Sequence, residues 1–471
     1  MKDFLKYTLA TVTGIIAVSA VMMFLGIISL IGMLASEQSK PKVKDNSVFV
    51  LSLSGAMQER SEDDVFSQIT GNAPAVVGLE DVLNSIRKAK DDDNIKGIYI
   101  EAGMFVPDSP ASTQAIRKQL ADFKESGKWI VAYADAYTQS TYYICSVADK
   151  VLLNPQGVVD WRGLAAQPIF LKDLMAKFGV KMQLAKVGKY KSAPEMFTAD
   201  KMSGPNREQV AAYINGIWDT MLTDVAQSRK LSKQRLDAYA DSMVTLAAAE
   251  ELVKMKMVDK LVYASDVKGE IKRLLGIDAD RKINQLTLAD MKNLPGADNG
   301  KGGEVAVYYA YGDVVDTNPG GINTEACIAG DKVCSDLEKL ADDDDVKAVV
   351  LRVNSGGGSA YASEQIWHAV MKLRERKPVV VSMGGMAASG GYYLSCAANY
   401  IYAEPTTLTG SIGIFGMFPD FSGLLTDKLG IKFDEVTTNK HSAFGTMARP
   451  FNAEEMAYLN AYIDRGYRLF I

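Results

Sequence analysis

The two halves of this 471-residue chain carry matching residues in the same order, about 250 positions apart. Runs 131–143 and 381–393 both end in a Tyr-Tyr pair. Five residues of the first half, Tyr142, Tyr143, Ala148, Pro155 and Gly163, recur 250 positions later as Tyr392, Tyr393, Ala398, Pro405 and Gly413. Farther on, residues 178–181 correspond to residues 429–432, with the offset longer by one. Because the order is kept throughout, the chain is predicted to fold as two copies of one unit.

A run of glycines and polar residues at 294–303 separates the two copies. We therefore divide the chain into a membrane anchor and linker (1–44), a first repeat (45–293), a linker (294–303) and a second repeat (304–471). The second repeat stops at Ile471, opposite Met221 of the first and inside a helix expected from Ala453 onward. On that comparison the second repeat is expected to be truncated at its C-terminus.

Each copy alternates short β-branched runs with helical stretches. In the second copy we expect strands at Val305–Ala310, Val346–Val353 and Val379–Ser382, with a helix over 360–376 before the last of these. Strand–helix–strand alternation at this spacing predicts an α/β fold in which parallel strands are joined by right-handed crossover helices. The aspartate runs 91–93 and 343–345 are expected to be solvated turns, without a catalytic role.

Residues 7–36 contain no charged side chain over 30 positions. This is longer than the roughly 20 apolar residues that span a bilayer. It is also long for the apolar region of a cleaved signal peptide, which is the alternative interpretation. We expect one N-terminal transmembrane helix that stays attached. Lysines flank the segment on both sides, so the distribution of positive charge does not decide its orientation.

The bulk composition argues against several classes of function. A net charge of −5, with 23% charged residues, does not suggest nucleic-acid binding. The four cysteines form no CxxC pair and the chain has two histidines, so neither a structural zinc site nor another cofactor is expected. Cys327 and Cys334 are close enough in sequence to form a local disulfide, and two unpaired thiols are the equal alternative.

Ser389 is the strongest candidate for a nucleophile. It lies between two alanines and two glycines, directly after an apolar β-type segment. Small neighbours allow a substrate backbone to approach closely, and glycine permits the sharp turn that presents a hydroxyl. Gln139 stands at the corresponding place in the first copy, so only the second copy carries the serine.

Residues 354–358, Asn-Ser-Gly-Gly-Gly, follow an expected strand and precede an expected helix. Backbone N–H groups of Gly357 and Gly358, together with that of Gly390, are candidates to stabilise an oxyanion. The alternative is a tight strand-to-helix turn and nothing more. The first copy has Phe-Val-Pro at 105–107 in place of the glycines.

A serine hydroxyl needs a base to accept its proton. Our candidate is Lys191, in the first copy, whereas His368 is expected to lie on a helix face. His441 is a second possibility, because either it or Ser442 stands opposite Lys191 in the second copy. The first copy lacks the serine and the second lacks the lysine, which favours one composite site built from both.

To act as a base, Lys191 must be neutral, so burial has to lower its pKa from about 10.4 to about 7–8. Ser411, in the run Thr-Gly-Ser-Ile-Gly-Ile-Phe-Gly, is expected to position the amine through a hydrogen bond. A hydroxyl that merely occupies a glycine-rich turn is the alternative.

Four motifs occur together in order: Tyr-Lys191-Ser-Ala, Asn-Ser-Gly-Gly-Gly-Ser359, Ala-Ala-Ser389-Gly-Gly-Tyr-Tyr and Thr-Gly-Ser411-Ile-Gly-Ile-Phe-Gly. With the anchor and both repeats, they resemble the signal peptide peptidase A family in its long, duplicated form (protease IV). The resemblance implies tandem Clp-protease/crotonase-like α/β domains. It also implies a serine–lysine dyad of Ser389 and Lys191, with Ser411 as helper.

The same resemblance implies a single-pass protein of the inner (cytoplasmic) membrane whose catalytic body faces away from the cytoplasm. Such a protein assembles as a homo-oligomer, a tetramer in this family, and degrades signal peptides after their release. One departure is Gly356, where the family usually has proline. The rival functions are a crotonase-like enzyme acting on acyl thioesters and an inactive envelope scaffold.

Overall fold

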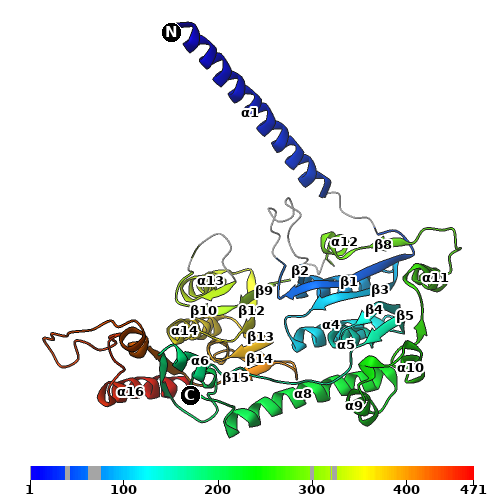
Figure 1. Cartoon of the computed structure of the whole chain (residues 1–471). Helices are drawn as coiled ribbons and strands as arrows, with labels where there is room; N and C mark the ends of the chain where they lie inside the picture. Colours follow the sequence, from blue (N-terminus) through cyan, green and yellow to red (C-terminus); the bar gives the residue numbers. More distant parts are fainter. Residues whose placement is uncertain (1, 38–42, 62–75, 297–301, 319, 321–325) are drawn as a thin grey trace.

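A computed structural model shows two parallel β-sheets side by side and one long N-terminal helix that stands away from them (Figure 1). The structure describes residues 2–37, 43–61, 76–296, 302–318, 320 and 326–471. Parts of both expected linkers, 38–42 and 297–301, therefore lie outside the described residues. The predicted α/β class is confirmed.

The first sheet has seven strands in the order β2-β1-β3-β4-β5-β7, with β8 paired to β1, and every pair is parallel. The strands are β1 (Ser47–Gln58), β2 (Val76–Gly78), β3 (Ile95–Val106), β4 (Trp129–Tyr137), β5 (Lys150–Val159), β7 (Lys260–Leu261) and β8 (Asn284–Leu286). Its helices are α3 (Leu79–Asp91), α4 (Pro110–Lys124), α5 (Gln139–Cys145), α8 (Gly204–Arg229), α9 (Lys233–Asp241), α10 (Ala249–Lys254), α11 (Ala264–Leu275) and α12 (Leu288–Asn293), with a 3-10 turn at Val244–Leu246. Helices cover both faces, so apolar side chains on either face of a strand, such as Val48 and Phe49, are fully buried.

The second sheet has five strands in the order β14-β13-β12-β9, with β15 paired to β13, and all its pairs are parallel. It contains β9 (Glu304–Tyr311), β12 (Val346–Ser355), β13 (Val379–Ala388), β14 (Tyr400–Tyr402) and β15 (Leu408–Gly410). The remaining elements are β10 (Asp313–Val315), β11 (Cys327–Ala329), α13 (Gly330–Asp342), α14 (Ala360–Arg376), α15 (Gly390–Ser395) and α16 (Ala453–Phe470). The order β9-β12-β13-β14 repeats the order β1-β3-β4-β5 of the first sheet.

Strand β13 is longer than the expected strand at Val379–Ser382. It continues to Ala388 because its C-terminal part pairs with β15, where Met386 lies opposite Leu408 and Ala388 opposite Gly410. The sequence after Met383 is rich in glycine and alanine, which hides the strand from a pattern based on apolar residues. As a result the strand leads directly into Ser389.

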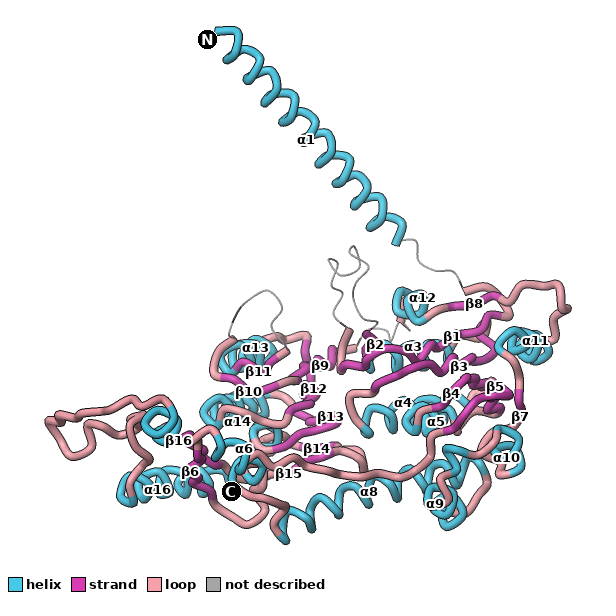
Figure 2. Tube along the Cα trace, viewed as in Figure 1, coloured by secondary structure: helices cyan, strands magenta, loops and turns pink. Residues whose placement is uncertain are grey.

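The two halves are joined by a short antiparallel ribbon. Strand β6 (Lys181–Lys186) of the first half pairs with β16 (Phe415–Asp420) of the second, and the two lie together beside α16 (Figure 2). Helices α6 (Lys172–Lys177) and α7 (Glu195–Thr198) flank β6, and a π-helical turn, η2 (Leu424–Lys428), follows β16. This ribbon carries the segment that contains Lys191 over to the second half.

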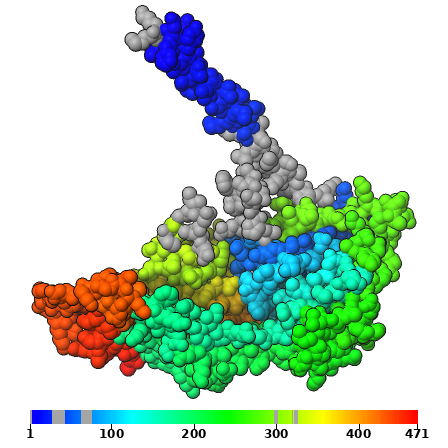
Figure 3. Space-filling view, in the orientation of Figure 1, coloured from blue at the N-terminus to red at the C-terminus, as the bar shows by residue number. Residues whose placement is uncertain are grey.

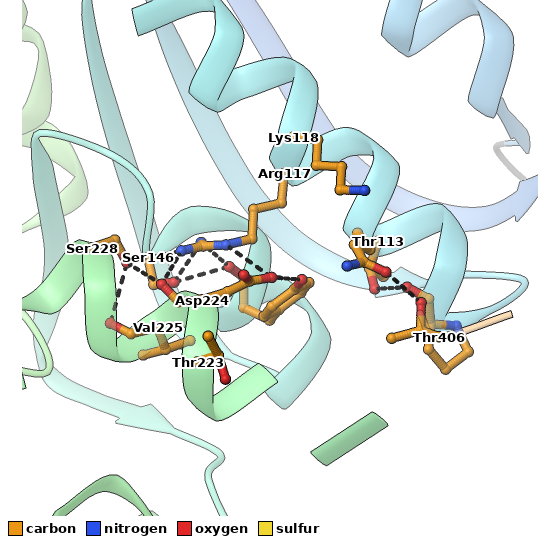
Figure 4. Close-up of polar contacts among 12 residues, drawn as sticks. Thr113, Arg117, Lys118, Ser146, Thr223, Asp224, Val225, Ser228 and Thr406 are labelled. Carbon is orange, nitrogen blue, oxygen red and sulfur yellow. Dashed lines mark hydrogen bonds and ion pairs between the residues drawn. The ribbon is translucent and has the colours of Figure 1, made fainter. Parts of the chain in front are cut away.

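Helix α4 contacts both halves (Figure 4). On one side, Gln114 accepts a hydrogen bond of 2.7 Å from Thr406 of the second half, in a buried position. On the other side, the buried Arg117 donates to the backbone oxygens of Tyr143 and Asp224, and so ties α4 to α5 and α8. Buried polar groups that all have partners hold such a junction in one geometry.

Helix α1 (Lys2–Glu37) projects from the body, and its apolar side chains from Phe4 to Leu25 are exposed (Figure 3). By length and composition, its segment Asp3–Gly26 of 24 residues could cross a membrane, as expected. Cys327 and Cys334 are both free thiols, so the structure supports the unpaired alternative for these two residues.

Candidate active site

Ser389 occupies a sharp turn between β13 and α15. Its backbone angles are φ 51° and ψ −115°, a conformation that side chains with a Cβ rarely adopt. The N–H of Ser389 donates to Gly410 O at 2.9 Å, which ties the turn to β15. Gly391, two residues after Ser389, packs closely against β12. A Cβ at this position would lie 2.7 Å from Ser355 O, so the packing requires glycine. Strained residues of this kind are typical of functional sites.

Lys191 reaches this turn from the first half. Its Nζ lies 3.0 Å from Ser389 Oγ, 3.0 Å from Ser411 Oγ and 2.6 Å from Ser411 O. The lysine is only 4% exposed, and burial lowers its pKa to about 8. The three residues that the sequence singled out therefore meet in space, although 198 and 220 positions separate the lysine from the two serines.

Two further residues hold the lysine segment in place. Gln209 of α8 donates to the backbone oxygen of Tyr190 at 3.2 Å and to Ser192 Oγ at 2.6 Å, on either side of Lys191. The buried carboxylate of Glu195 accepts from Ser203 and Asn206, which fixes the start of α8. The sequence offered no local signal for these contacts, because a long helix brings Gln209 back to the loop only in the folded chain.

The glycine run after β12 packs directly against the serine turn. A Cβ on Gly357 (φ 98°) would lie 2.5 Å from Gly390 N and 2.8 Å from Ser389 Cβ. The N–H of Gly357 already donates to Ser355 Oγ at 3.1 Å. Within the described residues, the N–H groups of Gly358 and Gly390 donate to no acceptor. Only these two of the three candidate oxyanion donors are therefore free.

The alternative bases lie elsewhere. His441 Nε2 is 3.7 Å from Glu454, and its ring packs against Tyr458, both on α16. His368 is on α14 with an exposed side chain, as expected for a helix-face residue. In the part of the chain that the structure describes, no group of three or more His, Cys, Asp or Glu side chains is placed to hold a metal ion.

A cavity of about 780 Å³, lined by residues of both halves, adjoins the glycine run. Gly356 of the glycine run and Met386 of β13 are among its lining residues. Apolar side chains from both halves contribute to the rest of the lining: Met57, Tyr213, Ile217 and Leu408. Carboxylates of Glu59 and Asp108 also line it, and Glu59 forms an ion pair with Arg352.

Relatives were found for most of the chain. It is 38% identical to Protease 4 of Salmonella typhi over 83% of this chain and 64% of that protein. It is 32% identical to Protease 4 of Haemophilus influenzae over 95% of this chain and 75% of that protein. The chloroplastic serine protease SPPA of Arabidopsis thaliana is 27% identical over 91% of this chain and 62% of that protein. The chain thus spans between three fifths and three quarters of the length of these relatives.

Overlays on solved structures are weak. A ClpP1 mutant from Listeria monocytogenes is 24% identical over 20% of this chain and 46% of that chain, with a TM-score of 0.15. A membrane-bound stomatin-specific protease is 11% identical over 52% of this chain and 98% of that chain, with a TM-score of 0.29. Neither overlay supports an inference about this chain.

Family models agree with the duplicated architecture. The model for Clp protease matches residues 323–407, which include the glycine run and the serine turn. The model described as peptidase family S49 matches one segment in each half, residues 122–278 and 371–471. Together these two segments cover more than half of the sequence, and they contain Lys191 in the first and Ser389 in the second. The chain belongs to peptidase family S49.

Proposed function

We propose that this protein is a membrane-anchored serine endopeptidase in which Ser389 is the nucleophile and Lys191 the general base. The observation that carries the proposal is the 3.0 Å distance between a buried amine, Lys191 Nζ, and Ser389 Oγ. A nucleophile and a base within hydrogen-bond reach, with a third group that orients the base, form the arrangement required for acyl transfer.

Ser411 is the positioning residue of the dyad. A neutral amine has two N–H groups, and Ser411 O and Ser411 Oγ are placed to accept both of them. The nitrogen lone pair is then directed at Ser389 Oγ. Because the pKa of Lys191 is about 8, a usable fraction of the amine is neutral near pH 7 to 8.

In the first half-reaction, Ser389 Oγ attacks the peptide carbonyl while its proton passes to Lys191. The ammonium then protonates the departing amine as the C–N bond breaks, which leaves an ester on Ser389. In the second half-reaction, Lys191 takes a proton from water, and the hydroxide adds to the ester carbonyl. Collapse of that intermediate releases the acid, and the proton returns to Ser389 Oγ.

The negative charge on the carbonyl oxygen needs donors that are not otherwise engaged. We assign this role to the N–H groups of Gly358 and Gly390, which have no other acceptor among the described residues; a Cβ on Gly390 would lie 3.2 Å from Gly358 N, so the two residues are close neighbours. The N–H of Gly357 is a weaker candidate because it donates to Ser355 Oγ.

The proposed substrates are released signal peptides and other unstructured apolar peptides. The cavity beside the glycine run is lined in part by apolar side chains from both halves, which suits an apolar peptide. We further propose that α1 holds the body at the inner (cytoplasmic) membrane, on its extracytoplasmic face, and that the protein acts as a homo-oligomer.

A serine-directed phosphonate probe tests the proposal on the whole protein. Labelling at Ser389 that is lost in Lys191→Met supports the dyad, with Lys189→Met as the matched control because Lys189 is exposed. Absence of labelling supports a scaffold. Hydrolysis of acyl thioesters in preference to apolar peptides supports a crotonase-like enzyme. Preference for charged over apolar peptides of equal length contradicts the assigned substrate class.

A further inference from the structure

The pairing between strands β12 and β13 is interrupted just before the active site. Its register shifts between Val353 and Ser355, so residues 384–386 of β13 stand opposite Asn354 alone. An irregularity of this kind leaves backbone groups without a partner in the ladder. From this point β12 leads into the glycine run and β13 leads into Ser389. A group that bridges the gap therefore fixes both of them.

The side chain of Asn354 bridges this gap and also reaches the first half. Its Oδ1 accepts the N–H of Met386 at 3.0 Å. Gly384 provides the space, since a Cβ there would lie only 2.9 Å from Asn354 Cβ. The Nδ2 group donates to Glu59 Oε2 and to Asp108 Oδ2, both at 3.1 Å. Because the backbone N–H requires an acceptor and the carboxylates require a donor, this orientation of the amide satisfies all three partners.

Glu59 is itself held in one geometry. It is 5% exposed, and the guanidinium of Arg352 on β12 donates to both of its oxygens. The same guanidinium donates to Ser382 Oγ at 3.0 Å and to Met383 O at 3.1 Å, both on β13. Moving the carboxylate away would leave a buried charge without its partner, which is costly. Glu59 therefore offers Asn354 a fixed acceptor that belongs to the other half of the chain.

The first repeat forms the corresponding strand without these side chains. At the offset of 251 that aligns the glycine run with residues 105–107, Asn354 corresponds to Gly103 and Arg352 corresponds to Glu101. Strand β3 continues through both positions, so the repeated fold requires neither the amide nor the guanidinium. Both groups occur in the repeat that carries the serine, which associates them with the active site.

The glycine run needs to be held at both ends, because glycine has more conformational freedom than any other residue. Gly357 and Gly358 have φ angles of 98° and 156°. At the C-terminal end, Val314 N donates to Gly357 O at 3.0 Å, and Val314 O accepts from Ser359 N at 2.8 Å. At the N-terminal end, the side chain of Asn354 makes the contacts described above. The N–H of Gly358, assigned to the oxyanion, lies between these two attachments.

We propose that Asn354 and Glu59 are positioning residues, and that the Glu59 carboxylate, through the Asn354 amide, holds the glycine run in place beside Ser389. The first half then contributes to catalysis twice, through Lys191 as the base and through Glu59 as the anchor of the glycine run. This inference rests on the proposed peptidase function. Donors aimed at an oxyanion act in the transition state, so loss of the contact between Glu59 and Asn354 should lower kcat and change KM little.

An exchange of donor and acceptor tests the contact in the full-length protein. Asn354→Asp places a carboxylate against Glu59 and Asp108 and should lower kcat about ten- to a hundredfold, with KM within about twofold. Asn354→Ala, which introduces no like charge, should show a similar loss. Glu59→Gln alone sets one amide N–H₂ group against another and should also lower kcat. In the double variant the Gln amide can donate to the new carboxylate, so its kcat should exceed that of either single variant.

Gln114→Leu is the matched control, because it removes a different buried hydrogen bond between the halves, the one from Thr406. It should lower the melting temperature and leave kcat unchanged. Amide hydrogen exchange of the segment 355–359 gives a readout besides activity: exchange should be faster in Asn354→Asp and slower again in the double variant. An unchanged kcat in Asn354→Asp, a rise in KM alone, or a double variant no better than Asn354→Asp refutes the inference. Full activity of Ser389→Ala would instead refute the proposed function, and the hydrogen exchange would still report whether Asn354 holds the glycine run.

Discussion

The two repeats form the same strand–turn–helix. In the first repeat the side chain at the turn is hydrogen-bonded within its own half, whereas in the second it faces a side chain from the other half. In the first repeat, Gln139 accepts hydrogen bonds from the N–H groups of Arg162 and Gly163 and donates to Gly163 O. In the second repeat, Ser389 takes the place of Gln139, and its short side chain leaves room for Lys191. The fold therefore accepts either residue, and local hydrogen bonding decides whether a reactive group is presented.

The difference extends to the backbone and to the neighbouring position. Gln139 does not have a positive φ, whereas Ser389 at the corresponding position has φ 51°. The position that corresponds to Ser411 in the first repeat is Trp161, 250 residues earlier. Trp161 is fully buried, whereas Ser411 is exposed and accepts a hydrogen bond from the amine of Lys191. The polar groups of the first turn are hydrogen-bonded to one another. The second turn has a strained backbone at Ser389 and two N–H groups, of Gly358 and Gly390, without an acceptor in the described part of the chain, as expected of a site that must bind a substrate.

The largest effect expected from this comparison is on catalysis. Ser389→Ala should lower kcat for peptide hydrolysis by at least about a thousandfold, because alanine has no hydroxyl to attack the peptide carbonyl. Gln139→Ala, at the corresponding turn, should leave kcat unchanged and reduce only stability. Peptidase assays on both variants, with thermal melting to verify folding, decide the matter. Full activity of Ser389→Ala would remove the second turn from the mechanism.

Loss of the base should follow closely. Lys191→Met should lower kcat by at least about a hundredfold, whereas Lys440→Met and His441→Gln, near the corresponding place of the second repeat, should have little effect. In the unmodified protein the rate should rise with pH through about 8, because only the neutral amine accepts a proton. Activity that survives Lys191→Met and is lost in His441→Gln would place a serine–histidine site within the second repeat.

Lys191→Met should also stabilise the fold near pH 7. The folded-state pKa of about 8 lies below the value of about 10.4 in an unfolded chain. The unfolded chain therefore binds more protons between these values, and the folded chain gains stability as pH rises through about 8 to 10. Below pH 8 a buried ammonium disfavours the fold by an amount on the order of 1 kcal/mol or more. Denaturant unfolding of both proteins at pH 7 and pH 10 measures this, and a variant less stable at pH 7 contradicts it.

Backbone strain should make glycine more stable than alanine at Ser389, and alanine more stable than glycine at Gln139. Ser389→Gly should be more stable than Ser389→Ala by about 1 kcal/mol, because glycine adopts a positive φ without strain. At Gln139, in the first turn of α5, alanine should be better than glycine by about 0.5–1 kcal/mol. Free energies of unfolding of the four variants test this reversal. The same order at both turns would contradict the assigned strain.

The smallest effect is expected at Ser411. Ser411→Ala removes the hydroxyl acceptor but keeps the carbonyl that lies 2.6 Å from Lys191 Nζ. One neutral hydrogen bond is worth about 0.5–1.5 kcal/mol, so kcat should fall about two- to tenfold. Steady-state kinetics across pH 6 to 10 check this. An unchanged rate would mean that the carbonyl alone positions the amine.

Much of the fold was predictable because its signals are local. Apolar runs predicted β9, β12 and the start of β13, and the spacing of 250 predicted that the two sheets share one order. The end of β13 was missed, because its glycines and alanines give no apolar pattern. This part is a strand because its backbone pairs with β15, which is distant in sequence. Gln209 was missed for a similar reason, because α8 brings it to the lysine loop only after folding.

The sequence by itself determined which repeat could supply a serine and which a lysine. Gln139 has no hydroxyl, unlike Ser389 at the corresponding place, and the second repeat has no lysine at the place of Lys191. Only the tertiary structure decided that these residues meet. The β6–β16 ribbon brings Lys191 to 3.0 Å from Ser389, and burial at that junction lowers its pKa. Distance and desolvation depend on how two halves pack together, and no local pattern in the chain encodes either of them.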